Sequence, residues 1–283
     1  MEFTRSLVRH KVFAKHPVTI VDVGVSGGFE KHWHEFGSQK IMYGFEARGV
    51  PSMRTAPYEG KHYIFPVALS DIDGQREFYV TAKRHASSFY KPFSHYVNRF
   101  HGWENLEILE PRMLDVRDLY SFSKEHDLLP FDFMKLDCEG AELDVLIGMR
   151  GRLDSVVGVS VEALFQKWRD GQPTFRDVDR FMIGQGFKLF TFTHYSVQKR
   201  CVPKQGRSTS GKMGQVLWGQ FIYLRDIMDD MEKGKFYDSY QILKTACYLE
   251  IYNLRDCVIE LLQYAVHHKV DFGFNIAPFI GGL

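Results

Sequence analysis

The sequence predicts an α/β fold with a doubly wound, mostly parallel sheet and a helical appendage at its C-terminal end. Short apolar runs alternate with amphipathic segments, as they do in parallel sheets whose helices cover both faces. Small or acidic residues directly follow several of these runs. From about residue 226 onward the periodicity is purely helical. We therefore expect a basic, helical segment at 1–17, a sheet-containing domain at 18–225 and the helical appendage at 226–283.

The composition is that of a globular protein with a sizeable core, because 45% of the residues are hydrophobic and 15% are aromatic. The net charge of +1 argues against a dedicated nucleic-acid binder, which needs clustered cationic charge. Four cysteines without a C-x-x-C pair fit a reducing compartment better than a disulfide framework. Neither a signal-peptide pattern nor an apolar run of about 18 residues is visible, so we expect a cytoplasmic protein without a transmembrane segment.

The first predicted strand covers residues 18–23 and is rich in β-branched residues. Glycines follow it, and aromatic residues at helical spacing come next, which predicts a strand–turn–helix unit. The glycines are Gly24, Gly27 and Gly28, and the aromatic residues are Phe29, Trp33 and Phe36.

Further apolar runs predict the remaining strands of the sheet, at 41–45, 62–69, 131–136, 156–161, 187–192 and 220–224. A tight turn at Asp73-Gly74 precedes a short strand at 77–80. Thr174 and Asp177 have the spacing of a capping box, which predicts that a helix begins there. The helical spacing of four apolar residues predicts an amphipathic helix in the appendage: Val258, Leu261, Leu262 and Ala265.

The residues that end the predicted strands are candidates for a ligand site, because open parallel sheets bind ligands beyond the carboxyl ends of their strands. A turn rich in glycine lets backbone amides approach a ligand without obstruction by Cβ atoms. Glu46 lies 22 residues beyond Gly24, a spacing suited to a carboxylate that binds the ribose hydroxyls of an adenosine cofactor. The strand-end segments are 22–28, Glu46, 70–71, 137–139 and Glu162.

Two other interpretations of the glycine turn are weaker. The dinucleotide fingerprint G-x-G-x-x-G is broken, because Ser26 and Phe29 occupy its second and third glycine positions. The segment 24–28 matches the hydrolase elbow G-x-S-x-G literally. However, an elbow normally follows several earlier strands, and this turn follows the first predicted strand.

Residues 132–148, DFMKLDCEGAELDVLIG, resemble the signature of the FkbM-type methyltransferases, which read approximately D-x-x-K-x-D-x-E-G-x-E-x-x-V-L-x-G. Supporting matches are Val21-Asp-Val-Gly24, Phe45-Glu46 and Ala68-Leu-Ser-Asp71. The resemblance covers about residues 18–225 and does not extend to the appendage. The chain departs from the family at Ala47, where proline is common, and at 25–28, where the family often has A-N-x-G.

The resemblance implies a class I S-adenosylmethionine (SAM)-dependent methyltransferase with a seven-stranded Rossmann-like sheet. It also implies SAM as the cofactor and O-methylation of a hydroxyl on a sugar, a glycan or another small natural product. The residues that we expect to bind the cofactor are Asp22, Gly24, Ser26, Gly27, Gly28, Glu46, Leu69, Ser70 and Asp137.

Asp137 is the first candidate for a catalytic residue, because it ends a central strand close to where the methyl group is expected. Glu139 is the second candidate. Glu142 lies on the first turn of the next helix, where a carboxylate also simply stabilises the helix dipole. Lys135, in an otherwise apolar strand, is expected to form an ion pair. The segment 83–103 is a candidate acceptor lid, with His85 or His95 as a base, although either histidine also fits a plain surface role.

Several points stay open in the sequence. A non-catalytic binding or scaffolding module on the same fold is the alternative to an enzyme. Asp137 and Glu139 are compatible with a divalent metal ion, but no spacing demands one. The helices after residue 226 fit either self-association into a homo-oligomer or cover for a sheet edge. The basic segment 199–214 is expected to be an exposed loop.

Overall fold

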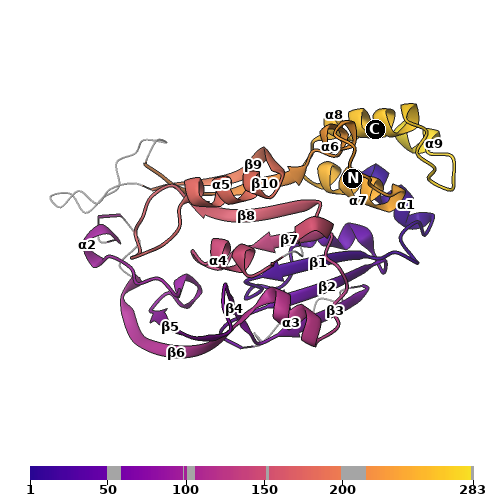
Figure 1. The fold of residues 1–283 in the computed structure, drawn as a ribbon. Coiled ribbons are helices and arrows are strands. Elements are labelled where there is room, and N and C mark those ends of the chain that lie inside the picture. Colours follow the sequence, from indigo (N-terminus) through magenta and orange to yellow (C-terminus); the bar gives the residue numbers. More distant parts are fainter. Residues whose placement is uncertain (50–58, 98, 101–105, 151–152, 199–214, 282–283) are drawn as a thin grey trace.

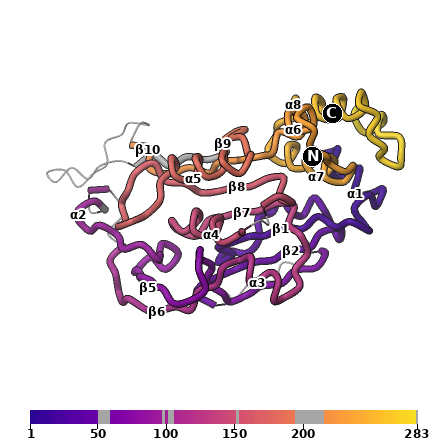
Figure 2. The backbone as a smooth tube through the Cα atoms, in the orientation of Figure 1, coloured from indigo at the N-terminus to yellow at the C-terminus, as the bar shows by residue number. Residues whose placement is uncertain are grey.

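The computed structural model describes residues 1–49, 59–97, 99–100, 106–150, 153–198 and 215–281 (Figures 1 and 2). The predicted basic segment 199–214 lies outside this description. In chain order the elements, with η for a 3-10 helix, are α1 (Glu2–Arg9), β1 (Val18–Val23), η1 (Lys31–Phe36), β2 (Lys40–Phe45), β3 (Lys61–Phe65), β4 (Ala68–Ser70), β5 (Gly74–Thr81), η2 (Arg84–Ala86), α2 (Ser94–Val97), β6 (Ile108–Asp118), α3 (Leu119–Glu125), β7 (Phe133–Leu136), α4 (Glu142–Ile147), η4 (Leu153–Ser155), β8 (Gly158–Leu164), α5 (Phe175–Gly184), β9 (Phe187–Gln198), β10 (Gln215–Arg225), α6 (Ile227–Glu232), α7 (Ser239–Ile251), α8 (Arg255–His267) and α9 (Ala277–Ile280).

The described central sheet has seven strands in the order β3-β2-β1-β7-β8-β10-β9. β10 is antiparallel to both of its neighbours, and the pairs from β3 to β8 are parallel. The chain builds outward from β1 to β2 and β3, then returns to place β7 on the other side of β1. The strand order therefore reverses between β1 and β7, where open α/β sheets bind ligands. The predicted mostly parallel, doubly wound sheet is confirmed.

Side chains on the two faces of the central sheet enter two separate hydrophobic clusters, as β1 illustrates. In β1, Val18 and Ile20 point to the face covered by α1, η1, α7 and α8. Val21 and Val23 point to the face covered by α3, α4 and α5. Because both faces are covered, all six residues of β1 are buried, which explains why apolar residues occur on both faces of this strand.

A second, three-stranded sheet has the order β4-β6-β5 and lies at the end of the molecule opposite to α6–α9 (Figure 1). The single strand predicted at 62–69 is wrong. Its first part is β3 at the edge of the central sheet, and its second part is β4, which pairs with β6. β5 also pairs with β6 rather than with β4, so the turn at Asp73-Gly74 does not form a hairpin between consecutive strands.

Two local predictions need correction. Glu162 was expected after the end of its strand, but it lies within β8 and pairs with Gln220 of β10. The segment after the glycine turn is a 3-10 helix, η1, although Trp33 and Phe36 are buried as expected. The capping box of α5 at Thr174 and Asp177 is confirmed.

The N-terminal helix and the C-terminal helices pack together at one end of the central sheet, and both chain ends lie there (Figure 1). The carboxylate of Glu250 in α7 accepts hydrogen bonds from the backbone N–H groups of Phe3 (3.1 Å) and Thr4 (2.9 Å). Lys244 of α7 reaches the buried carboxylate of Asp132 at 2.7 Å, just before β7. The four apolar residues predicted to face inward from α8 are all buried. No described helix has the length and hydropathy that a membrane span requires.

Candidate active site

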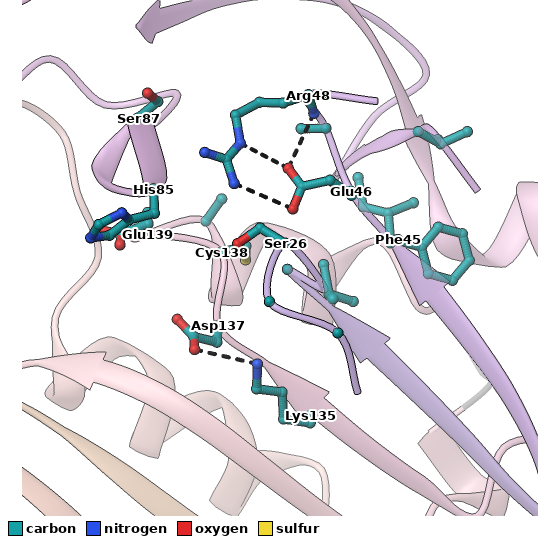
Figure 3. Close-up of a pocket in the computed structure, with 18 of the residues that line it drawn as sticks. Ser26, Phe45, Glu46, Arg48, His85, Ser87, Lys135, Asp137, Cys138 and Glu139 are labelled. Atoms are coloured by element: carbon teal, nitrogen blue, oxygen red, sulfur yellow. Dashed lines mark hydrogen bonds and ion pairs between the residues drawn. The ribbon is translucent and has the colours of Figure 1, made fainter. Parts of the chain in front are cut away.

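A cleft of about 540 Å³ opens at the carboxyl ends of β1, β2 and β7, where the strand order reverses. Figure 3 shows Ser26 of the glycine turn between Glu46 on one side and Asp137 on the other. The cleft brings together most of the site residues that the sequence predicts. These are Gly24, Ser26, Gly27, Gly28, Glu46, Leu69, His85, Asp137 and Glu139.

The turn after β1 requires glycine at its first position. Gly24 has φ +94°, and a Cβ atom there would lie 1.9 Å from the carbonyl oxygen of Asp137. The amide of Gly24 also donates to the carbonyl of Phe45 at 2.9 Å. Gly27 differs, because a Cβ atom added there meets nothing within 4 Å. The turn is thus clamped between β2 and β7 at Gly24, while Gly27 leaves open space in the cleft for a ligand.

Asp22 does not line the cleft. It is buried beneath the turn, and burial raises its pKa to about 6, with Lys135 acting in the opposite direction. The ammonium of Lys135 lies 3.5 Å from Asp22 and 3.3 Å from Asp137. Burial acts to lower the pKa of Lys135, but the carboxylates of Asp22 and Asp137 outweigh it and hold this pKa above its ordinary value. The ion pair predicted for Lys135 is therefore present, and it connects the buried Asp22 to the cleft residue Asp137.

Glu46 follows β2 and is held by Arg48, which the sequence did not single out. The Nε atom of Arg48 donates to Glu46 Oε1 at 2.9 Å, and the backbone N–H of Arg48 donates to the same oxygen at 3.2 Å. A further guanidinium nitrogen of Arg48 bonds the backbone carbonyl of Arg84 in η2. Arg48 thus crosses the cleft opening from the end of β2 to η2 (Figure 3).

The turn after β7 presents the two predicted catalytic carboxylates. Asp137 and Glu139 both line the cleft, and the side chain of Asp137 is 40% exposed. Glu142 does not line it. Its Oε1 atom accepts hydrogen bonds from the backbone N–H groups of Cys138 (2.8 Å) and Gly140 (3.1 Å). Burial raises the pKa of Glu142 to about 7, so this carboxyl group is a structural part of the turn.

His85 lies on η2 and lines the cleft, as Glu139 does (Figure 3). His95 is exposed on α2 and does not line the cleft, so only His85 of the two predicted bases is placed at the site. Residues 101–103 of the predicted lid lie outside the described residues.

Ser70 was expected to bind the cofactor, but it is fully buried outside the cleft. Its hydroxyl donates to Asp71 at 2.9 Å and accepts from Arg76 at 2.8 Å. Arg76 also pairs with Asp144 of α4 at 2.6 Å. Ser70 therefore connects β4, β5 and α4 instead of reaching a ligand.

Sequence reasoning missed several cleft residues. Glu30 and Lys31 come soon after the glycine turn, and this closeness in sequence could have identified them as cleft residues. Phe78 forms part of the apolar wall from outside the central sheet, and no local pattern marks it, whereas Phe89, also in the wall, falls within the predicted lid segment 83–103. Among the described residues no group of three or more His, Cys, Asp or Glu side chains is arranged to hold a metal ion.

The sheet order and the cleft at the reversal point define this protein as a Rossmann-like α/β protein with a ligand site at the carboxyl ends of its parallel strands. The model of the Methyltransferase FkbM domain matches residues 22–189, and the chain therefore belongs to the FkbM methyltransferase family. The family, fold class and enzyme class predicted from the sequence are confirmed.

Comparison with curated proteins gave no match. Among solved structures, the chain is similar to the SAM-bound crystal structure of magnesium protoporphyrin IX methyltransferase from Synechocystis PCC 6803. The identity is 9% and the TM-score 0.31, with 79% of this chain and 78% of that chain covered. At this distance the similarity carries no argument about the present site.

Proposed function

We propose that this protein transfers a methyl group from SAM to a hydroxyl group of a sugar, a glycan or another small natural product. The observation that supports the proposal most is that one cleft holds an open glycine turn, the carboxylate of Glu46 and the carboxylate of Asp137. The first two suit the amino-acid and ribose portions of SAM, and Asp137 faces the place where the acceptor must approach.

The residues of the cleft fit SAM in three respects. The open side of Gly27 leaves room for a ligand against the backbone. Glu46 offers two carboxylate oxygens to two ribose hydroxyls once Arg48 moves aside. Leu69, Phe78 and other apolar side chains provide a wall for a flat base.

When bound, SAM supplies a methyl group already activated on a sulfonium. The acceptor oxygen attacks this methyl carbon as the carbon–sulfur bond breaks, and the hydroxyl proton must go to a base. Asp137, held by Lys135 at 3.3 Å, orients the acceptor hydroxyl in line with the methyl group. His85, which lines the same cleft, takes the proton through its ring nitrogen.

Isothermal titration with S-adenosylhomocysteine tests the cofactor assignment, and transfer of tritiated methyl groups into fractions of the source organism tests the acceptor class. Label in a carbohydrate fraction that is stable to mild base supports an ether of a sugar hydroxyl. Asp137→Asn should reduce transfer about 100-fold while cofactor binding changes less than about 3-fold. A folded sample that binds no S-adenosylhomocysteine at millimolar concentration removes the proposal.

A further inference from the structure

A completely buried arginine lies directly behind the acceptor end of the cleft. Arg169, in the loop between β8 and α5, is only 1% exposed and does not line the cleft. One guanidinium nitrogen donates to the carboxylate of Glu139 at 2.7 Å and to the carbonyl oxygen of Ala86 at 3.0 Å. The other terminal nitrogen donates to the backbone carbonyl of Glu139. The guanidinium carbon lies 4.2 Å from the centre of the Trp168 ring.

These partners come from three segments that are far apart in the sequence. Glu139 belongs to the turn after β7, Ala86 ends η2, and Arg169 itself lies in the loop 165–174. Removing a guanidinium from water costs several kcal/mol, and only well-formed partners offset that cost. The guanidinium of Arg169 donates to Glu139 and to Ala86, which belong to two parts of the cleft wall, so the group does more than fill space.

The turn that Arg169 holds has an unfavourable backbone conformation. Glu139 has φ +61°, in the left-handed region that residues other than glycine seldom adopt, and Gly140 follows at φ +105°. Such a conformation is unfavourable and persists where the surroundings of the residue fix it. A Cβ atom at Gly140 would lie 3.3 Å from the Arg169 guanidinium, so the arginine packs tightly against the turn. The hydroxyl of Ser88 donates to the same Glu139 carbonyl at 2.7 Å.

We propose that Arg169 is the positioning residue that sets the separation between Glu139 and η2, and therefore between the two sides of the acceptor end of the cleft. The inference rests on the proposed function, because it assigns this end to the acceptor. Glu139, in the turn after β7, and His85, on η2, both line the cleft. Arg169 touches neither cofactor nor acceptor and acts through these two residues.

The chain offers a matched control in Arg225 of β10. Arg225 is also buried, at 5% exposed, and its guanidinium lies 4.3 Å from the centre of the Phe187 ring. It donates to the backbone carbonyls of Val156 (2.9 Å), Leu153 (2.7 Å) and Gln185 (3.0 Å). Its contacts are as numerous as those of Arg169, but none involves a cleft residue. Arg225→Met therefore reports the general effect of removing a buried arginine.

The test compares Arg169→Met, Arg169→Lys and Arg225→Met in the full chain. In Arg169→Met we expect tritium transfer per folded molecule to fall about 100-fold, while the Kd for S-adenosylhomocysteine changes less than about 3-fold. Arg169→Lys should recover part of the loss, since its single ammonium can still pair with Glu139. Arg225→Met should transfer within about 3-fold of wild type, even if its thermal midpoint falls equally.

Hydrogen exchange provides a readout that needs no acceptor. The amides of residues 84–90 should exchange at least about 10-fold faster in Arg169→Met and at the wild-type rate in Arg225→Met. Equal exchange in the two variants, or equal transfer, overturns the inference, as does a parallel loss of cofactor binding in Arg169→Met. If wild type itself binds no S-adenosylhomocysteine, the proposed function fails, and the exchange rates still decide whether Arg169 fixes η2.

Discussion

Replacing Glu46 with glutamine should weaken cofactor binding by an amount that the surroundings of this carboxylate determine. Each hydrogen bond from a ribose hydroxyl to the Glu46 carboxylate contributes about 1.5–3 kcal/mol to cofactor binding. A glutamine oxygen would instead accept one neutral hydrogen bond, which contributes about 1 kcal/mol. Arg48 contacts the same carboxylate at 2.9 Å, and displacing this partly exposed partner costs about 1 kcal/mol. The net loss for Glu46→Gln is about 2 kcal/mol, or about 30-fold in Kd.

Arg48→Met should act in the opposite direction, because it removes the group that competes with the ribose. Its Kd for S-adenosylhomocysteine should fall about 5-fold, and the gap to wild type should narrow at high salt. Isothermal titration at two ionic strengths measures both variants. Glu35→Gln is the control, since Glu35 pairs with Arg5 outside the cleft. A Kd of Glu46→Gln within about 3-fold of the wild-type value would refute this reasoning. So would a Kd of Arg48→Met that is about 10-fold higher than wild type.

Three further predictions concern stability. Gly24→Ala should lower the free energy of unfolding by about 3 kcal/mol or more, because its Cβ atom would lie 1.9 Å from the carbonyl oxygen of Asp137. The control Gly27→Ala, whose Cβ atom would meet nothing within 4 Å, should unfold like wild type in urea. Glu142 is protonated more readily in the folded state, with a pKa of about 7 against 4.5, so stability should fall by about 3 kcal/mol as the pH rises between these values. Glu142→Gln should remove this dependence, and parallel stability–pH curves would contradict the assignment. Lys244→Met leaves the buried carboxylate of Asp132 without its 2.7 Å partner and should lower the free energy of unfolding by about 3–5 kcal/mol. The control Lys233→Met, in an exposed pair, should lower it by less than about 0.5 kcal/mol. Equal midpoints of the two variants in a thermal melt would show that α7 is not anchored through the Lys244–Asp132 pair.

The strands of the central sheet were predictable where both faces are buried. β1 and β2 are apolar runs because each of their residues is buried. β6 was not predicted as a strand, because most of its residues are exposed and its sequence includes Glu110, Pro111 and Arg112. The boundary between β3 and β4 was missed for a related reason, since an apolar run does not reveal that the chain leaves one sheet for another.

The predicted site depended on strand ends and on glycine, which are local signals. Gly24 and Glu46 follow buried strands directly, so the topology brings them to one edge. Arg48 and Arg169 gave no such signal, because an arginine in a loop is usually exposed and its partners here come from distant segments. The prediction that Ser70 binds the cofactor was not met for the opposite reason. Its motif is local, but its hydroxyl belongs to a hydrogen-bond network next to the cleft. The divisions at residues 17 and 225 and self-association through the C-terminal helices stay predictions.

The contact between α1 and α7 has a consequence for biosynthesis. The amides of Phe3 and Thr4 find their acceptor in Glu250, so α1 completes its docking only after α7 has been synthesised. Until α7 has left the ribosome, Phe3 and Leu7 on the buried side of α1 lack the part of their hydrophobic cluster that α7 supplies. A chain whose translation stops before α7 should therefore expose apolar surface on α1 and be prone to capture by chaperones.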